Sequence, residues 1–159
     1  MRFLIALLAL AGVFDSYLAL RIHNQDPSVA PPCAVTEKWD CGAVNHSRYS
    51  VFPPESLFED PGSKAIHVPV ALLGIIGYSV IFLLSIANLL KLTLLSALGG
   101  FAFAGYLSYL EKFTIEKWCI YCVWSQTIIA AILLCTIVAL ILERRRKRRF
   151  ERSAIMVAQ

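Results

Sequence analysis

Four long apolar segments, separated by polar stretches, dominate the pattern of the chain. They cover residues 3–22, 68–90, 92–110 and 119–142. Each is close to the roughly 20 residues that a helix needs to cross the hydrocarbon core of a bilayer. No segment alternates apolar and polar residues as a half-buried strand does, and lipid admits only helices and closed barrels. The pattern therefore predicts an all-α membrane protein, a four-helix transmembrane bundle.

The first two apolar segments carry residues that refine this picture. Residues 3–22 could instead be a signal peptide cleaved near residues 9–11, but the apolar run is long for a signal core, which favours a spanning helix. Asp15 is an ionisable group inside this helix. It could exchange protons with a functional site or pair with Arg21, and pairing is the favoured interpretation. In the second segment, Gly74 and Gly77 would let a neighbouring helix approach closely.

Residues 23–67 form a long polar segment between the first two predicted helices. The segment holds six of the seven prolines and two of the five cysteines. A structureless connection of this length is usually functional or disordered, and the cysteines favour a functional loop. We therefore expect a long extracytoplasmic loop between helices 1 and 2.

Composition and charge placement support a membrane protein and orient it. The chain is 58% hydrophobic and only 16% charged, whereas soluble domains are about 45–50% apolar and about 25% charged. Seven of the fifteen basic residues lie in 144–152. Basic residues favour the cytoplasmic side, so we expect a membrane domain at 1–142, a basic cytoplasmic tail at 143–159 and both termini in the cytoplasm. A lipid-facing anchor is preferred over nucleic-acid binding for this tail.

This orientation brings four cysteines to one face of the membrane. Cys33 and Cys41 lie in the outer loop, whereas Cys119 and Cys122 form a Cys-x-x-Cys pair at the outer end of the last apolar segment. An outer face is oxidising. A mobile pair beside a fixed pair can pass electrons by thiol–disulfide exchange. Static structural disulfides are the alternative, and a zinc site is a weaker one because a second knuckle is missing.

The surroundings of the Cys-x-x-Cys pair indicate where the electrons could go. A helix N-terminus favours the thiolate at Cys119, whereas apolar surroundings oppose it. Aromatic residues cluster nearby, namely Phe113, Trp118, Tyr121 and Trp124. An aromatic pocket at the lipid boundary suits a flat quinone, although an interfacial aromatic belt would look the same. Cys135, deeper in the segment, is interpreted as a packing residue.

Taken in order, the motifs of this chain resemble those of the vitamin K epoxide reductase family, particularly its bacterial homologues. The order comprises Cys33-x7-Cys41 followed by Ser47, then residues 69–74 (PVALLG), then residues 118–122 (WCIYC). The resemblance covers roughly residues 5–142. It implies four membrane helices and an activity that couples thiol–disulfide exchange to a quinone or a quinone epoxide.

The resemblance also implies a role for each cysteine. Cys33 would accept the first electrons from a partner's thiols, and Cys41 would exchange with Cys119. Cys122 would face the quinone, which would be of the ubiquinone, menaquinone or vitamin K type. Ser47 and Asn45 would support the loop near the site. Some relatives carry a fused thioredoxin-like domain and this chain has no room for one, so the resemblance implies a separate, soluble extracytoplasmic thioredoxin-fold partner.

Two departures bear on the substrate. Gln126 stands where the animal enzymes have a tyrosine that helps to hold the vitamin K ring. The family's asparagine at the start of helix 2 has no clear match, and His67 lies near that place. Both departures favour a bacterial-type thiol:quinone oxidoreductase that supports disulfide bond formation. Together with the charge placement, this predicts a protein of the inner or plasma membrane with its active site on the periplasmic face. No metal is expected in that site. Reduction of vitamin K epoxide is the alternative within the family, and a non-enzymatic membrane protein with structural disulfides is the alternative outside it.

Overall fold

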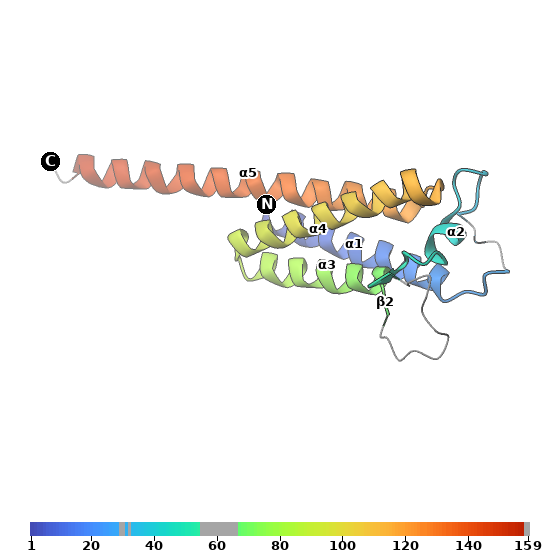
Figure 1. Cartoon of the computed structure of the whole chain (residues 1–159). Coiled ribbons are helices and arrows are strands. Elements are labelled where there is room, and N and C mark those ends of the chain that lie inside the picture. Colours follow the sequence, from blue (N-terminus) through green and yellow to red (C-terminus); the bar gives the residue numbers. More distant parts are fainter. Residues whose placement is uncertain (29–30, 32, 55–66, 158–159) are drawn as a thin grey trace.

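Helices build almost all of the protein, with a small amount of strand at one end (Figure 1). The computed structural model describes residues 1–28, 31, 33–54 and 67–157. Within these ranges the elements in chain order are α1 (Arg2–His23), α2 (Cys41–Asn45), β1 (Val51–Phe52), β2 (Val68–Pro69), α3 (Val70–Ile86), α4 (Leu90–Leu110), the π-helical turn η1 (Glu111–Ile115) and α5 (Ile120–Val157). The predicted predominance of helix is confirmed.

Three helical stretches are long and apolar enough to cross a membrane. They are Arg2–His23, Leu90–Ile115 and Ile120–Arg149, whereas α3 is apolar but has 17 residues. Their outer faces carry large apolar side chains that a soluble protein would bury, such as Phe3, Leu95 and Leu134, which are 71%, 67% and 64% exposed. These faces are suited to lipid. The fourth span and the long outer loop, part of which lies outside the described residues, stay predictions.

Close approach of α1 to α3 is made possible by two glycines. A Cβ at Gly12 would lie 2.5 Å from the ring of Tyr78, and one at Gly74 would lie 2.6 Å from the Ser16 hydroxyl. The predicted role of Gly74 is confirmed. Gly77 has no atom within 4 Å of a Cβ placed on it, so the same prediction is wrong there. Small residues thus bring the two helices together, as in other membrane bundles.

Buried hydroxyl groups in the bundle find partners on the backbone. Ser85 at the end of α3 donates to the carbonyl of Arg2 at 2.8 Å, which ties the start of α1 to the end of α3. Thr93 and Thr136 donate to the carbonyls four residues earlier in their own helices. In an apolar surrounding each unpaired polar group would be costly, so these pairs allow polar residues inside a bundle that faces lipid.

The helix boundaries differ from the predicted ones in three places. The turn between α3 and α4 occupies 87–89, with Asn88 in the left-handed region at φ 58°, so α3 is shorter than 68–90. The charged stretch after Leu110 separates two apolar segments of the sequence, yet Glu111–Ile115 continues α4 as a π-helical turn. The basic tail continues α5 to Val157, because Arg, Lys and Glu are good helix formers.

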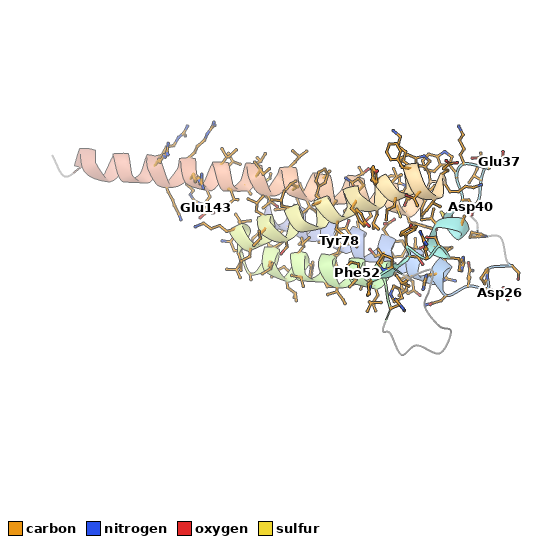
Figure 2. All side chains as sticks on the ribbon, viewed as in Figure 1. Asp26, Glu37, Asp40, Phe52, Tyr78 and Glu143 are labelled. Atoms are coloured by element: carbon orange, nitrogen blue, oxygen red, sulfur yellow. A yellow bond between two sulfur atoms is a disulfide. The ribbon has the colours of Figure 1, made fainter. Side chains whose placement is uncertain are left out.

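Helix α2 and strand β2 lie at one end of the bundle, and both termini lie toward the other (Figure 1). The acidic side chains Asp26, Glu37 and Asp40 lie at the α2 end, and Glu143 lies toward the opposite end (Figure 2). Strands β1 and β2 pair antiparallel, and the Val70 N–H donates to the Ser50 carbonyl at 2.8 Å. These contacts hold the segment after α2 against the start of α3.

Candidate redox site

A backbone contact fixes the segment that carries Cys41 beside the segment that carries Cys119. The Trp118 N–H donates to the Lys38 carbonyl at 2.8 Å, and the Asp40 N–H donates to the Trp118 carbonyl at 3.1 Å. The Trp39 and Trp118 rings lie 6.2 Å apart on this short bridge. These hydrogen bonds hold together two segments that are about 80 residues apart in sequence. The residue that follows each segment is a cysteine, so Cys41 and Cys119 lie close to each other.

Three of the four predicted redox cysteines share one small buried cluster. Cys33, Cys41 and Cys119 pack together with Ile22 and Val44, and Cys122 packs against the cluster from α5. Cys41 and Cys119 are both 0% exposed. Cys33 and Cys41 form a disulfide with a Cα–Cα distance of 5.8 Å, whereas Cys119 and Cys122 are free thiols. The loop pair is thus oxidised while the helix pair is reduced.

Asn45 joins the two pairs. Its side-chain amide donates to the Cys41 carbonyl at 2.9 Å and to the Cys119 sulfur at 3.6 Å. The backbone carbonyl of Asn45 accepts from Nδ1 of His23, at the end of α1, at 2.7 Å. A buried amide with partners on both sides keeps its rotamer. Asn45 therefore fixes the position of the Cys119 sulfur relative to α2.

Cys119, directly before the first residue of α5, has a pKa below the ordinary cysteine value. The largest cause is a hydrogen bond from the Cys122 thiol, and the backbone N–H groups of Tyr121 and Cys122 add to it. Burial and the nearby Glu111 carboxyl act in the opposite direction. The hydrogen bonds outweigh them, so the arrangement favours a thiolate at Cys119 and a thiol at Cys122. A thiolate is the species that attacks a disulfide.

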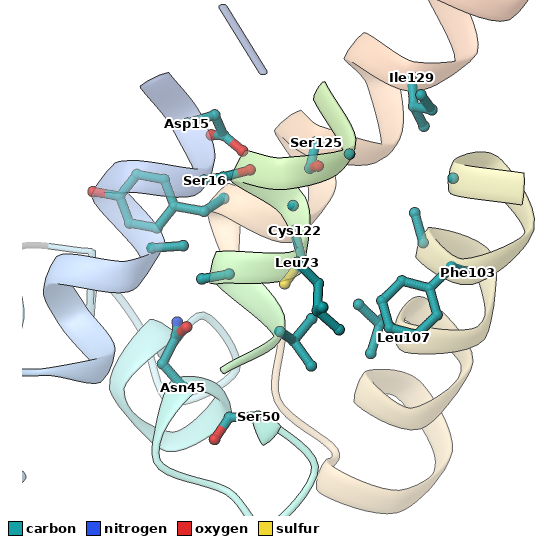
Figure 3. Close-up of a pocket in the computed structure, with 18 of the residues that line it drawn as sticks. Asp15, Ser16, Asn45, Ser50, Leu73, Phe103, Leu107, Cys122, Ser125 and Ile129 are labelled. Atoms are coloured by element: carbon teal, nitrogen blue, oxygen red, sulfur yellow. The ribbon is translucent and has the colours of Figure 1, made fainter. Parts of the chain in front are cut away.

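A cavity of about 340 Å³ lies beyond Cys122 among α1, α3, α4 and α5. Figure 3 shows Cys122 in the middle of its wall, with Leu73 beside it and Phe103 and Leu107 across from it on α4. Its lining is mainly apolar. Polar groups also line it, among them Asp15, Ser16, Asn45, Tyr78, Glu111 and Ser125. Volume and lining match a site for a small organic molecule.

Some of the residues that the sequence predicts for the quinone site line the cavity, and others do not. Cys122, Tyr121, Asn45 and Ser47 line it. Ser47 also donates to the Val44 carbonyl at 2.8 Å, so it orders its own turn. The other four candidates are not among the residues that line the cavity. Trp118 pairs with Trp39, and Phe113 is 60% exposed. His67 donates to the Pro53 carbonyl, and Gln126 lies on α5. Their part in quinone binding stays a prediction.

Sequence reasoning missed several polar lining residues. No sequence pattern marks Glu111, Tyr78 or Ser125, although the Tyr78 hydroxyl lies 2.9 Å from the Ser125 hydroxyl. Asp15 lines the cavity, and among the described residues it forms no ion pair with Arg21. A carboxyl in an apolar run is the signal that marks Asp15. Glu111, eight residues before Cys119, carried no comparable signal.

Comparison with known proteins assigns the chain to a family. The model of the Vitamin K epoxide reductase family matches residues 3–137. The match includes all four cysteines of the cluster and the apolar helices around the cavity. A search of curated proteins finds no match. Among the described residues, no group of three or more His, Cys, Asp or Glu side chains is placed to hold a metal ion.

Proposed function

We propose that this chain, which belongs to the vitamin K epoxide reductase family, is a membrane thiol:quinone oxidoreductase that supports disulfide bond formation. It would take electrons from a soluble thioredoxin-fold partner at Cys33 and Cys41 and pass them through Cys119 and Cys122 to a quinone. One observation carries the proposal. Cys119 packs against the loop disulfide, while Cys122, its neighbour on α5, lines an apolar cavity.

The first exchange brings electrons from the partner. A thiolate of the partner attacks the Cys33–Cys41 disulfide at Cys33, and the partner's second thiolate then displaces Cys33. The partner leaves with a disulfide, and Cys33 and Cys41 become thiols. Cys33 suits this role because it lies on the connecting segment before α2, whereas Cys41 lies on α2 beside Cys119.

The second exchange passes the electrons inward. When Cys119 and Cys122 form a disulfide, the Cys41 thiolate attacks Cys119 and releases Cys122. Cys33 then attacks Cys41, which restores the Cys33–Cys41 disulfide and leaves Cys119 and Cys122 as thiols. The Cys33–Cys41 disulfide and the free thiols of Cys119 and Cys122 support this order of exchange, which would end with the same bonds.

The last step reduces the quinone. The two sulfur atoms of Cys119 and Cys122 join in a disulfide, and the quinone takes up two electrons and two protons as it becomes a quinol. The cavity supports this step because it is apolar, is large enough for a ring headgroup and has Cys122 in its wall. Leu73, Phe103 and Leu107 offer flat or branched surfaces for the ring.

The decisive experiment measures quinone reduction by the purified full chain with a reduced thioredoxin-like protein as the donor. Cys122→Ala is expected to abolish turnover, because no disulfide can form on α5. Cys41→Ala is expected to block the protein donor, yet to leave reduction by a small dithiol that reaches Cys119 directly. Cys135→Ala, which removes a thiol packed against the core, is the matched control and is expected to keep the wild-type rate.

Two outcomes would overturn the proposal. Unchanged turnover in Cys122→Ala would exclude the quinone step. Mass spectrometry after mild reduction with a dithiol could instead show that both cysteine pairs remain oxidised and that no mixed Cys41–Cys119 disulfide forms. That result would favour a membrane protein with structural disulfides. Turnover of vitamin K epoxide by the same preparation would assign the chain to the epoxide-reducing branch of the chemistry instead.

A further inference from the structure

The π-helical turn after α4 places a carboxyl group beside the redox pair, in the wall of the cavity. Glu111 begins η1, which ends at Ile115 and is followed by Glu116 in the left-handed region at φ 58°. The turn directs Glu111 inward, where it is 2% exposed. Its Oε2 accepts the backbone N–H of Cys119 at 3.2 Å. π-helical turns are rare and are frequent at functional sites, which is a first reason to ask what Glu111 does.

The second carboxyl oxygen of Glu111 is not used by the fold. Oε1 is buried and has no hydrogen-bond partner among the described residues. Glu111 lines the cavity together with Cys122, and its carboxyl lies within reach of the Cys122 thiol. An orphaned buried polar atom in a native fold requires an explanation. A free carboxyl oxygen beside a reacting thiol can receive the proton of that thiol.

Within the part of the chain that the structure describes, no Lys or Arg side chain lines the cavity beside Glu111. Among the described residues, the titratable groups that line the same cavity are Asp15 and His23 on α1, Tyr49 before β1, Tyr78 on α3, and Tyr121 and Cys122 on α5. A structural ion pair is therefore not the reason for burying this carboxyl.

We propose that Glu111 is the proton-transfer residue of the quinone-reducing step. The inference rests on the proposed function and deepens it. As the Cys122 S–H bond breaks, its proton passes to Glu111, and the two sulfur atoms join while two electrons go to the quinone. Glu111 then gives the proton to one oxygen of the reduced ring. The other oxygen takes a proton from the outer aqueous phase, which balances the proton that Cys119 lost when it became a thiolate.

The test follows a single turnover of the reduced full chain with a soluble short-chain ubiquinone, over a range of pH. Glu111→Gln keeps an oxygen for the Cys119 N–H but cannot carry a proton. Proton transfer by a positioned side chain contributes about 10²–10⁴-fold, so the variant is expected to lose at least about 100-fold in rate. Its remaining rate is expected to lose the part of the pH dependence that Glu111 contributes and to keep the part that deprotonation of Cys119 contributes, with the KM for the quinone unchanged. Glu116→Gln, an exposed change on the same stretch, is the matched control.

A second measurement separates proton transfer from a purely structural role. Exchange between the loop disulfide and the partner's thiols does not use Glu111, so Glu111→Gln is expected to trap a mixed disulfide with the partner at the wild-type rate. Glu111→Asp, which retains a carboxyl, is expected to recover a pH-dependent rate and serves where the glutamine variant fails to fold.

Several results would overturn the inference. They are a wild-type rate and pH profile in Glu111→Gln, a loss confined to KM, and a Glu111→Asp variant with no pH dependence. Failure of the wild-type chain to reduce quinone would instead reject the proposed function, and the role of Glu111 with it. If the wild type reduces quinone and the Glu111→Gln variant does so at the same rate, only the role of Glu111 is rejected.

Discussion

At the scale of single residues, Cys122 controls the charge of Cys119. Its thiol provides the largest contribution to the lowered pKa of Cys119. Cys122→Ala removes that hydrogen bond, so the pKa of Cys119 is expected to rise. Because the thiolate is the form above the pKa, the wild type keeps its Cys119 thiolate to lower pH than the variant does. Ultraviolet thiolate absorbance during a pH titration of the reduced chain measures the difference.

Two comparisons identify the group that titrates. Cys119→Ser is expected to remove the low-pH transition altogether, and Cys135→Ala is expected to leave it in place. An identical titration in Cys122→Ala and wild type would mean that the Cys122 thiol does not lower the pKa of Cys119.

The sequence could predict the identity of the reactive residues because cysteine spacing is a local property. It identified the competition at Cys119 between the helix N-terminus and burial but could not resolve it. The deciding hydrogen bond comes from a side chain whose rotamer depends on packing. Glu111 was beyond prediction for a similar reason: its inward direction results from a π-helical turn, and nothing in residues 111–115 distinguishes that turn from a link.

At the scale of the helices, Gly12 sets the distance between α1 and α3. A methyl group there would lie 2.5 Å from the Tyr78 ring, which is held by hydrogen bonds to Ser125. Gly12→Ala therefore forces the ring to move. The expected cost is about 1–3 kcal/mol, as for other overpacked cores. A lowered thermal midpoint of the purified chain in detergent measures this loss of stability.

Gly77→Ala is the matched control, since a Cβ at Gly77 meets no atom within 4 Å. That change is expected to leave the midpoint unchanged or to raise it, because alanine is the better helix former. Combining Gly12→Ala with Tyr78→Leu is expected to remove most of the cost of the glycine substitution. Equal loss of stability at both glycines would contradict the packing role assigned to Gly12.

Apolar runs predict where helices lie better than where they end. The core of each of the four long helices falls inside an apolar segment of the sequence, since a segment facing lipid must satisfy its own backbone. The ends depend on weaker effects. Asn88 in the left-handed region ends α3 early, and the basic residues after Leu142 extend α5 because they form helix well in water.

At the scale of the whole molecule, the cavity lay beyond what the sequence could predict. Its walls come from four helices and from the segment around Asn45, and no local pattern specifies which faces meet. The same limit explains why only some of the predicted quinone-binding residues line the cavity. Trp118 and Tyr121 are close in sequence, but Trp118 pairs with Trp39 outside the cavity while Tyr121 turns toward it. The juxtaposition of the two cysteine pairs, by contrast, followed from orientation alone.

The number of spans and the placement of the termini form the last prediction. At about 1.5 Å per residue, the 17 residues of α3 reach about 25 Å, slightly less than a bilayer core of about 30 Å. Its neighbours α1 and α4 pack along it, and a modest mismatch is met by local thinning. We therefore expect α3 to span, with Arg2, Lys91 and residues 144–149 together on the cytoplasmic side.

Epitope tags at the two ends test this topology in sealed cells and in inverted membrane vesicles treated with trypsin. Four spans predict that both tags are protected in the cells and both are lost in the vesicles. Three spans would place the tags on opposite sides, and cleavage of the first segment as a signal peptide would remove the N-terminal tag from the mature chain. A C-terminal tag that trypsin removes from sealed cells would reverse the orientation and would place all four cysteines of the redox site in the reducing cytoplasm, where a stable loop disulfide is not expected.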